Sequence, residues 1–232
     1  MLFDDRRHAG VLLANKLESY RGQAQTLILA LPRGGVVVGL ELSLALHLPL
    51  DVFITRKIGL PESPEYAVGA VSETGSVYFN PDAAGYTDAS REDLEGLIDA
   101  QRREIGRRQR LYRHGRQLPS LHNKTVILVD DGIATGSTFF ATIDAVKRLS
   151  PHRVVAAIPV SPGATADQVR RKVEECVILA TPESFGSVGE FYADFDQIED
   201  DEVVRCLEHA EQAYRELPHR FHHRASPAAA HH

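Results

Sequence analysis

The sequence predicts an α/β fold with a mainly parallel sheet flanked by helices. Three short, continuously apolar runs, at residues 26–31, 125–129 and 154–160, are typical of strands that are buried on both faces. Each run is followed by turn residues and then by a segment with helical spacing, so strands and helices alternate as in βαβ units. A chain of 232 residues, 43% of them hydrophobic, can bury such a sheet in one domain.

The first βαβ unit lies in the N-terminal quarter of the chain. Asp4 and Asp5 precede a segment whose apolar residues have helical spacing and which ends near Gly22. Three further elements follow in order: a strand at 26–31, a helix at 36–47 and a strand at 50–55. The Gly-rich turn PRGG joins the first of these strands to its helix.

A β-hairpin arm is expected next. Residues 59–66 contain two prolines and several polar side chains, which favours a loop. After it, AVGAVSE and SVYFN flank Thr74 and Gly75 as the two strands of a hairpin.

A long helix with a basic second half follows, over about residues 90–114. Residues 101–116 hold seven arginines and one glutamate, whereas residues 190–211 hold nine acidic residues and one arginine. We expect the basic half to cover the acidic segment, either in the same chain or in a neighbouring subunit of a homodimer. A groove for nucleic acid is the alternative.

The remaining chain continues the βαβ series. The elements are a strand at 125–129, a helix to about 149, a strand at 154–160, a helix at about 167–175 and a strand at 176–181. We expect one domain over residues 1–217, with the arm at about 59–116, a small C-terminal hood at about 178–217, and a disordered tail at 218–232.

Charge and composition exclude several classes of function. A net charge of −6 disfavours binding to nucleic acid or to an anionic membrane surface. Two cysteines without metal-ligand spacing argue against a disulfide framework or a zinc site. The sequence has no apolar run of the roughly 18 residues that a membrane-spanning helix needs, and it begins without a secretory signal pattern, so we expect a cytoplasmic protein.

The segment TVILVDDGIATGST, residues 125–138, carries the clearest chemical signal. An apolar strand delivers Asp130 and Asp131 to its carboxyl end, where ligands bind in open α/β sheets. Glycines and hydroxyl side chains then open a helix, whose free N–H groups and dipole favour an anion. Carboxylates accept hydrogen bonds from vicinal hydroxyls, so this arrangement suits a ribose 5-phosphate.

Other phosphate-binding motifs do not fit this loop. A Walker A loop needs a lysine after its last glycine, where this chain has Ser137, and the loop lacks the GxGxxG spacing of dinucleotide-binding folds. A capped helix after a buried strand is the structural alternative, but it leaves the two adjacent carboxylates unexplained.

The run VILVDDGIATGST resembles the thirteen-residue signature of the type I phosphoribosyltransferases, which bind phosphoribosyl pyrophosphate (PRPP). The runs ALPRGG and ITRKIG and the hairpin also fall in the order that this family uses. Together, residues 1–205 resemble a bacterial subgroup described as predicted phosphoribosyltransferases.

The resemblance implies roles for both glycine-containing loops. Asp130 and Asp131 would hold the ribose hydroxyls. The 5-phosphate would be held by the loop residues Gly132, Ile133, Ala134, Thr135, Gly136, Ser137 and Thr138. The loop with Arg33, Gly34 and Gly35 corresponds to the pyrophosphate loop of the family, which often contains a strained or cis peptide.

For catalysis, the resemblance points to cations at the pyrophosphate. Arg56 and Lys57, expected at the end of the second strand, would stabilise the charge on leaving pyrophosphate together with Mg²⁺. Mg²⁺ would bind mainly through PRPP and water, with Asp130 and Asp131 reaching it through water. Glu65, near the expected loop tip, is our preferred general base, with Glu73 as the alternative.

Recognition of the acceptor is assigned to the hood. Phe185, Phe191 and Tyr192 are aromatic residues that could stack on a base, although they could equally form a core patch. Ala134 occupies the position of an aspartate that serves the purine N7 in the hypoxanthine-guanine branch, so 6-oxopurines are expected to be poor substrates.

The expected function is a glycosyltransferase of the pentosyl class, active in nucleotide salvage. It would move the 5-phosphoribosyl group of PRPP to a nitrogen nucleophile and release pyrophosphate. Two alternatives stay open: a non-catalytic regulator that senses PRPP or nucleotides, and a hydrolase that uses water as the nucleophile.

Overall fold

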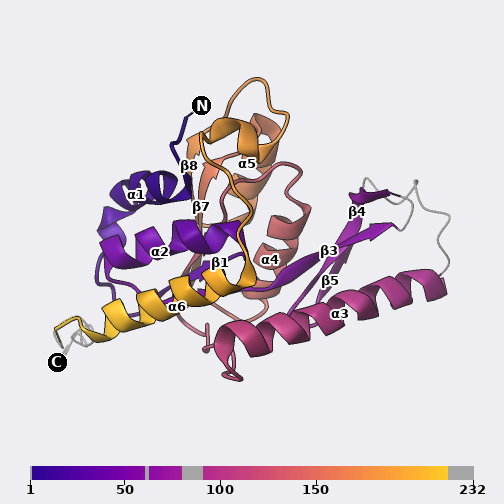
Figure 1. Cartoon of the computed structure of the whole chain (residues 1–232), viewed down its shortest axis with the longest axis horizontal. Helices are drawn as coiled ribbons and strands as arrows, with labels where there is room; N and C mark the ends of the chain where they lie inside the picture. Colours follow the sequence, from indigo (N-terminus) through magenta and orange to yellow (C-terminus); the bar gives the residue numbers. More distant parts are fainter. Residues whose placement is uncertain (1, 61–62, 80–90, 219–232) are drawn as a thin grey trace, which may run out of the picture.

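A parallel sheet of five strands forms the centre of the molecule, in the order β2-β1-β6-β7-β8 (Figure 1). The computed structural model describes residues 2–60, 63–79 and 91–218, except the side chains of residues 60, 63–68 and 91–93. The strands of the sheet are β1 (Thr26–Ala30), β2 (Leu50–Val52), β6 (Thr125–Val129), β7 (Arg153–Val160) and β8 (Glu175–Ala180). The predicted α/β class with a mainly parallel sheet is confirmed.

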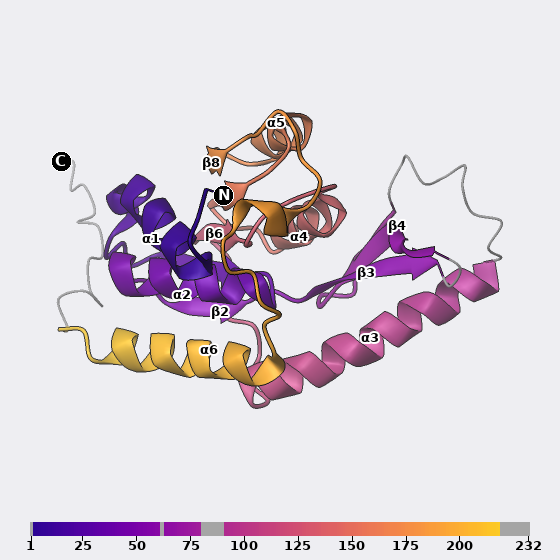
Figure 2. The ribbon, with the colours of Figure 1, turned by 45° about the horizontal axis from the view of Figure 1, so that its top comes forward.

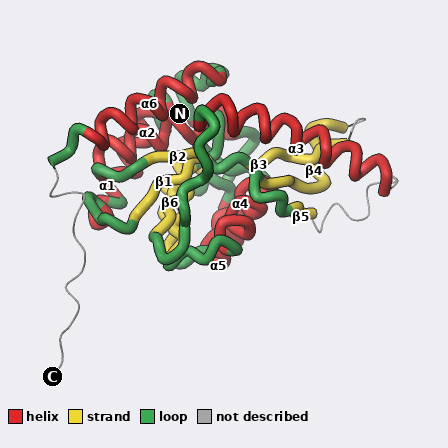
Figure 3. The backbone as a smooth tube through the Cα atoms, turned by 90° about the horizontal axis from the view of Figure 1, so that it is seen from below, coloured by secondary structure: helices red, strands yellow, loops and turns green. Residues whose placement is uncertain are grey.

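Helices cover both faces of this sheet, as Figure 3 shows. On one side lie α1 (Arg6–Lys16), α2 (Gly34–Leu46) and α6 (Asp200–Arg215), and on the other α4 (Ser137–Lys147) and α5 (Gly163–Lys172). Alternate strand residues therefore enter two cores: Ile28 and Ile127 pack with the first group, Leu29 and Leu128 with the second. This two-sided burial is the physical reason for the continuously apolar strands.

Local sequence signals set the ends of the helices. Asp5 caps α1 by accepting a hydrogen bond from the His8 N–H at 2.7 Å. A short 3₁₀ turn, Glu18–Tyr20, then leads into β1. Helix α5 begins at Gly163, four residues earlier than expected, because Pro162 has a fixed φ of −57° that is compatible with a helix start.

The arm is a separate antiparallel sheet in the order β3-β4-β5, and a long helix lies along it (Figure 2). Its elements are β3 (Thr55–Leu60), β4 (Ser63–Ser72), β5 (Val77–Phe79) and α3 (Arg91–Arg113). The expected hairpin around Gly75 is present, with Gly75 at φ 83°. The loop expected at 59–66 is wrong for its described residues, because 59–60 belong to β3 and 63–66 to β4, and Gly59 pairs with Ala67 in an irregular register. Residues 61 and 62 lie outside the described residues.

The strand expected at 50–55 is divided between the two sheets. Strand β2 ends at Val52, and β3 begins at Thr55 as part of the arm. Arg56 and Lys57 therefore lie near the start of β3 and not at the end of the second parallel strand. No turn residue marks the junction between the two sheets, because the residues at the junction, Phe53 and Ile54, are apolar and fully buried.

The basic half of α3 meets the acidic segment of the same chain. Arg107 pairs with Asp200 at 2.7 Å, and Arg116 pairs with Glu211 at 2.8 Å. These contacts confirm the expected cover within one chain; a homodimer stays a prediction.

The expected hood at 178–217 divides into two parts. Residues 200–215 form α6, which packs on α2 and on α3, because Val203, Cys206 and Ala210 bury one of its faces in that core. The preceding segment contains a 3₁₀ turn, Val188–Phe191, and lies beside the N-terminus, where Phe3 and Tyr192 form a β-bridge. The tail from 219 onward lies outside the described residues.

The two cysteines and the character of the helices bear on what the composition predicted. Cys176 is half-buried and Cys206 is buried, and both are free thiols. None of the helices in the described part of the chain has the length and apolar character needed to cross a membrane.

Candidate functional site

A cavity of about 720 Å³ opens at the carboxyl ends of β1 and β6. These two strands are neighbours in register, with Ala30 opposite Val129. Their connections run in opposite directions, since β1 leads to β2 at one edge and β6 leads to β7 on the other side. Such a switch point leaves a crevice between the two loops that follow the strands, and ligands bind there in open α/β sheets.

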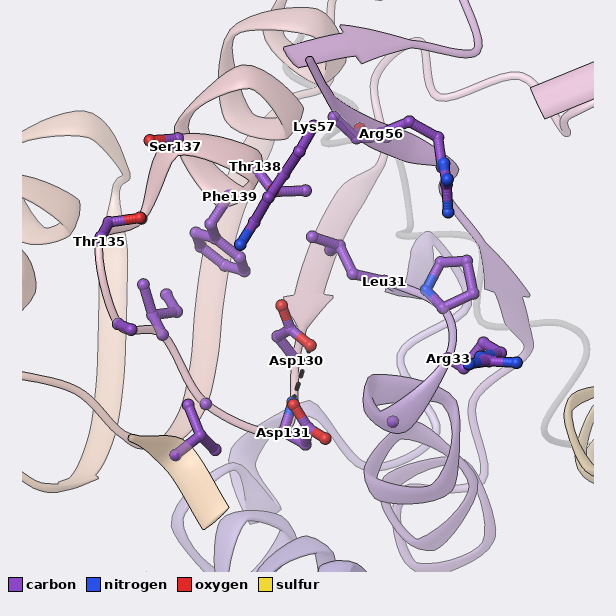
Figure 4. Close-up of a pocket in the computed structure, with 18 of the residues that line it drawn as sticks. Leu31, Arg33, Arg56, Lys57, Asp130, Asp131, Thr135, Ser137, Thr138 and Phe139 are labelled. Atoms are coloured by element: carbon purple, nitrogen blue, oxygen red, sulfur yellow. Dashed lines mark hydrogen bonds between the residues drawn. The ribbon is translucent and has the colours of Figure 1, made fainter. Parts of the chain in front are cut away.

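The two adjacent carboxylates lie at the floor of this cavity (Figure 4). Asp130 Oδ1 accepts a hydrogen bond from the Asp131 N–H at 2.9 Å, and Asp131 Oδ2 accepts one from Arg6 Nε at 2.7 Å. Burial and the charge of Asp131 raise the pKa of Asp130. Burial also raises the pKa of Asp131, against the opposing effect of the Arg6 guanidinium. The pair is thus a compact acceptor for ligand hydroxyls, with one carboxylate held by a buried arginine.

Arg6 is a site residue that the sequence reasoning missed. Its side chain is only 9% exposed, its Nη1 donates to the Asp196 carbonyl at 2.9 Å, and its guanidinium lies 3.7 Å from the ring centre of Phe195. The available signal was an arginine on the same helix face as Ala9 and Leu13, where a charged side chain needs a buried partner.

The loop after the acid pair leads into the start of α4, a position in a fold that favours anions. The first turn of a helix leaves its N–H groups without intrahelical acceptors, and those of Ser137, Thr138 and Phe139 lie at this cavity. Gly136 has φ 80°, and a Cβ there would lie 2.6 Å from Phe140. Thr165 Oγ1 donates to the Ala134 carbonyl at 2.9 Å and holds the loop in place.

A second loop, between β1 and α2, approaches the acid pair from the other side (Figure 4). The peptide bond between Pro32 and Arg33 is cis, in line with what the family resemblance implies for this loop. A Cβ at Gly34 would lie 1.8 Å from Asp131 Oδ2, and one at Gly35 would lie 2.9 Å from the Cα of Asp130. Only glycine permits this contact between the two loops.

Cations gather on the side of the cavity near this second loop. Arg33 Nη1 lies 3.1 Å from Glu199 Oε2, and Arg56 Nε donates to Gln101 Oε1 at 3.0 Å. Lys57 extends toward the centre of the cavity (Figure 4). Arg33, Arg56 and Lys57 all line the cavity, but the Lys57 amine lies near Phe139 on the α4 side, away from Arg33 (Figure 4). Arg56 and Lys57 both come from β3 of the arm.

Helix α3 contributes two lining residues that the sequence reasoning did not single out. Gln101 and Arg108 both reach the cavity from α3. Their spacing of seven residues was a usable signal, since it puts them on one face of a helix. Only the folded arm places this face of α3 at the cavity.

The expected base-stacking residues are not at the cavity. Tyr192 is 3% exposed, lies between Phe3 and Phe195, and donates its hydroxyl to the Asp131 carbonyl at 2.5 Å. Stacking by Tyr192 on a ligand is therefore wrong, because both faces of its ring are covered by protein.

Phe185 and Phe191 pack against each other with ring centres 5.0 Å apart, and neither lines the cavity. Val188 is the hood residue that does line it. A contact of Phe185 or Phe191 with a base stays a prediction.

The two candidate bases differ in what surrounds them. Glu73 is buried, with its side chain 2% exposed, and accepts hydrogen bonds from Arg113 Nη2 at 3.0 Å and the Ile54 N–H at 2.9 Å. It supports the base of the arm and is not free to reach a ligand. Glu65 lies in β4 and not at a loop tip, and its side chain is outside the described residues.

Comparisons with known proteins agree with this geometry. The family model described as a phosphoribosyl transferase domain matches residues 5–196. Two curated proteins from strains of Mycobacterium tuberculosis, each named "Putative phosphoribosyl transferase", are 39% identical over 215 residues, which is 93% of this chain. The chain spans 48% of their length. The crystal structure of the protein TT1426 from Thermus thermophilus is similar with a TM-score of 0.74 and 40% identity, covering 89% of this chain and 98% of that one.

Proposed function

Because this chain belongs to the phosphoribosyl transferase family, we propose that it transfers the 5-phosphoribosyl group of PRPP to a nitrogen of a nucleobase and releases pyrophosphate. One observation carries the proposal: in a single cavity, the acid pair lies between the loop that starts α4 and a second loop that carries Arg33, with Arg56 of β3 on the same side as Arg33 (Figure 4). PRPP has the matching order of groups, with ribose hydroxyls between a phosphate and a pyrophosphate.

Each part of PRPP would have its own set of partners. Asp130 and Asp131 would accept hydrogen bonds from the 2- and 3-hydroxyls. The N–H groups and hydroxyls of residues 132–138 would hold the 5-phosphate. Arg33, with the backbone at Gly34 and Gly35, would hold the pyrophosphate.

The reaction exchanges one bond at ribose C1 for another. The C1–O bond to pyrophosphate breaks and its electron pair leaves with the pyrophosphate, while the lone pair of the acceptor nitrogen forms the new C1–N bond. Arg56 and Lys57 would stabilise the negative charge that develops on the leaving group. Fixing both ends of PRPP would hold C1 in line with the acceptor, which lowers the entropic part of the barrier.

The acceptor nitrogen must also lose a proton. Glu65 remains our proposed acceptor of that proton, since Glu73 is committed to Arg113. Ala134 supplies no carboxylate beside the acceptor, so 6-oxopurines should be the poorest of the purines.

The residues at the cavity fit a Mg²⁺ ion that is carried by the substrate. Within the described part of the chain, no three His, Cys, Asp or Glu side chains gather as a metal cage, and one of the two cavity carboxylates already binds Arg6. Mg²⁺ typically keeps its waters and binds substrate phosphates. Asp130 and Asp131 would therefore reach Mg²⁺ through water, and the ion would neutralise charge on the pyrophosphate.

The test is calorimetric titration of PRPP with Mg²⁺, followed by a pyrophosphate-release screen across nucleobases. We expect binding, and release with one base or a small group of bases. The variant D130N/D131N should bind PRPP roughly 30- to 150-fold more weakly, because it replaces two charge-assisted hydrogen bonds, each about 1.5–3 kcal/mol, by neutral ones of about 0.5–1.5 kcal/mol.

The matched control removes two aspartate charges that do not line the cavity. D99N/D167N changes two exposed aspartates, each of which pairs with an arginine three residues along its helix, and it should bind PRPP like the wild type. Absence of PRPP binding in the wild type would refute the proposal. Binding without release would point to a regulator, and release without any base would point to a hydrolase.

A further inference from the structure

Helix α3 brings positive charge to the cavity from outside both PRPP loops. Gln101 and Arg108 are two turns apart on one face of α3, and both line the cavity. Arg33 and Arg56 line the same cavity from the second loop and from β3.

The hydrogen bonds of these residues leave donors for a ligand. Gln101 accepts from Arg56 Nε at 3.0 Å, which orients the guanidinium with a neutral partner and leaves its charge intact. Arg108 is 11% exposed in its side chain and donates from Nε to Glu104 Oε1 at 2.7 Å. Among the hydrogen bonds of the described residues, Arg108 donates none from its two terminal nitrogens.

Arg33, Arg56 and Arg108 form one wall of the cavity, and positive charge is in excess there. Burial, followed by the positive charges of Arg108 and Arg33, lowers the pKa of Arg56. Glu104 is shared by Arg107 and Arg108, and Glu199 pairs with Arg33, whereas none of the ion pairs among the described residues includes Arg56. Partly buried cations of one sign favour an anionic occupant, because such a ligand replaces the lost solvation and removes their mutual repulsion.

The wall is also held in a fixed position. Tyr112 donates its hydroxyl to Asp200, and Arg113 Nε lies 2.9 Å from Asp51 Oδ1. These contacts tie the C-terminal half of α3 to α6 and to β2. A pre-positioned guanidinium binds an anion with little further ordering of the side chain.

We propose that α3 completes the pyrophosphate subsite, with Arg108 as a further pyrophosphate-binding residue and Gln101 as a positioning residue that aims Arg56. The inference rests on the proposed function for the identity of the anion. Pyrophosphate offers several oxygens to the planar forks of two arginines, which suits it better to this wall than a single phosphate.

The experiment titrates pyrophosphate and PRPP separately, each with Mg²⁺, into the full chain. R108Q should weaken binding of both ligands by roughly 10- to 100-fold, the loss expected for a charge-assisted hydrogen bond or a pair of them. R103Q is the matched control, since Arg103 is an exposed arginine of the same helix and does not line the cavity. It should bind both ligands within about twofold of the wild type.

Conservative variants separate ligand binding from folding. R108K keeps the charge but loses the fork, so its affinity should fall between those of the wild type and R108Q. Q101L and Q101E should both weaken pyrophosphate binding, and Q101E should retain the melting temperature because it still accepts from Arg56. Q101L removes the acceptor of the Arg56 hydrogen bond and adds no charge, so wild-type pyrophosphate affinity in Q101L would overturn the positioning role.

The outcomes for this inference and for the proposed function are distinct. If the wild type binds PRPP and R108Q binds it as well as R103Q does, the role of Arg108 is refuted while the proposed function stands. If the wild type binds pyrophosphate but not PRPP, and R108Q weakens that binding, the proposed function fails while the anion subsite on α3 stands. If the wild type binds neither ligand, both fail.

Discussion

The contact between the second loop and the acid pair gives a sharp test of how the cavity is built. In the variant G34A, the new Cβ would lie 1.8 Å from Asp131 Oδ2 and 2.8 Å from Arg6 Nε. The Asp131 carboxylate must retreat by about 1.2 Å, the difference between 1.8 Å and the 3.0 Å within which real Cβ contacts are essentially never found. That movement breaks the 2.7 Å hydrogen bond from Arg6. A lost charge-assisted hydrogen bond corresponds to about 1.5–3 kcal/mol of the free energy of unfolding.

Thermal unfolding followed by circular dichroism, with calorimetric titration of PRPP, measures both consequences. The melting temperature of G34A should fall by roughly 3 to 12 °C, at about 2–4 °C per kcal/mol for a chain of this size, and PRPP affinity should fall with it because Asp131 is displaced. The matched control is G163A at the start of α5, where a Cβ would meet nothing within 4 Å. G163A should melt at or slightly above the wild-type temperature. If G34A has the same melting temperature and the same PRPP affinity as G163A, the packing of the loop on Asp131 is refuted.

Two further predictions concern charges around the cavity and on α3. E199Q removes the exposed carboxylate that competes for Arg33 at 3.1 Å, so titration should show PRPP binding tighter by up to about fivefold; weaker binding would contradict the competition. Hydrogen bonds from Arg107 and Arg108 lower the pKa of Glu104 from its ordinary 4.5 to about 2. A lowered carboxylate pKa stabilises the fold above pH 4.5, and that stability is lost as the pH falls toward 2. Urea unfolding should therefore find wild type more stable than E104Q at pH 7, with the difference shrinking between pH 4.5 and 2; a constant difference would show that the Glu104 charge is not its source.

The signature run shows how far local sequence can specify a site. Asp130 and Asp131 directly follow a buried strand, and the next residues must start a helix. Residues that are adjacent in the chain determine where the strand ends and where the helix begins, and the free N–H groups of that helix start favour an anion. The same holds for Gly34 after β1. For these residues the position at the cavity was predictable before the fold was known.

The arm shows where local sequence is insufficient. The run from Leu50 to Ile54 is apolar except for Asp51, and nothing within it marks the point at which the chain leaves one sheet for another. Arg56 and Lys57 are at the cavity, but they reach it from β3 of the arm. A strand's choice of partner depends on residues far away in the sequence, so it follows from the whole fold.

The sequence by itself determined the α/β class, the two loops at the cavity and the family resemblance, because these depend on periodicity and on residues that are adjacent in the chain. Only the tertiary structure decided that Arg6 holds Asp131, that Tyr192 is buried, and that α3 brings Arg108 to the cavity. Each of these pairs residues from distant segments, and the same side chain is a ligand contact or a core residue according to what packs against it. Such pairing is set by the burial and charge compensation of the complete fold, which no local pattern encodes.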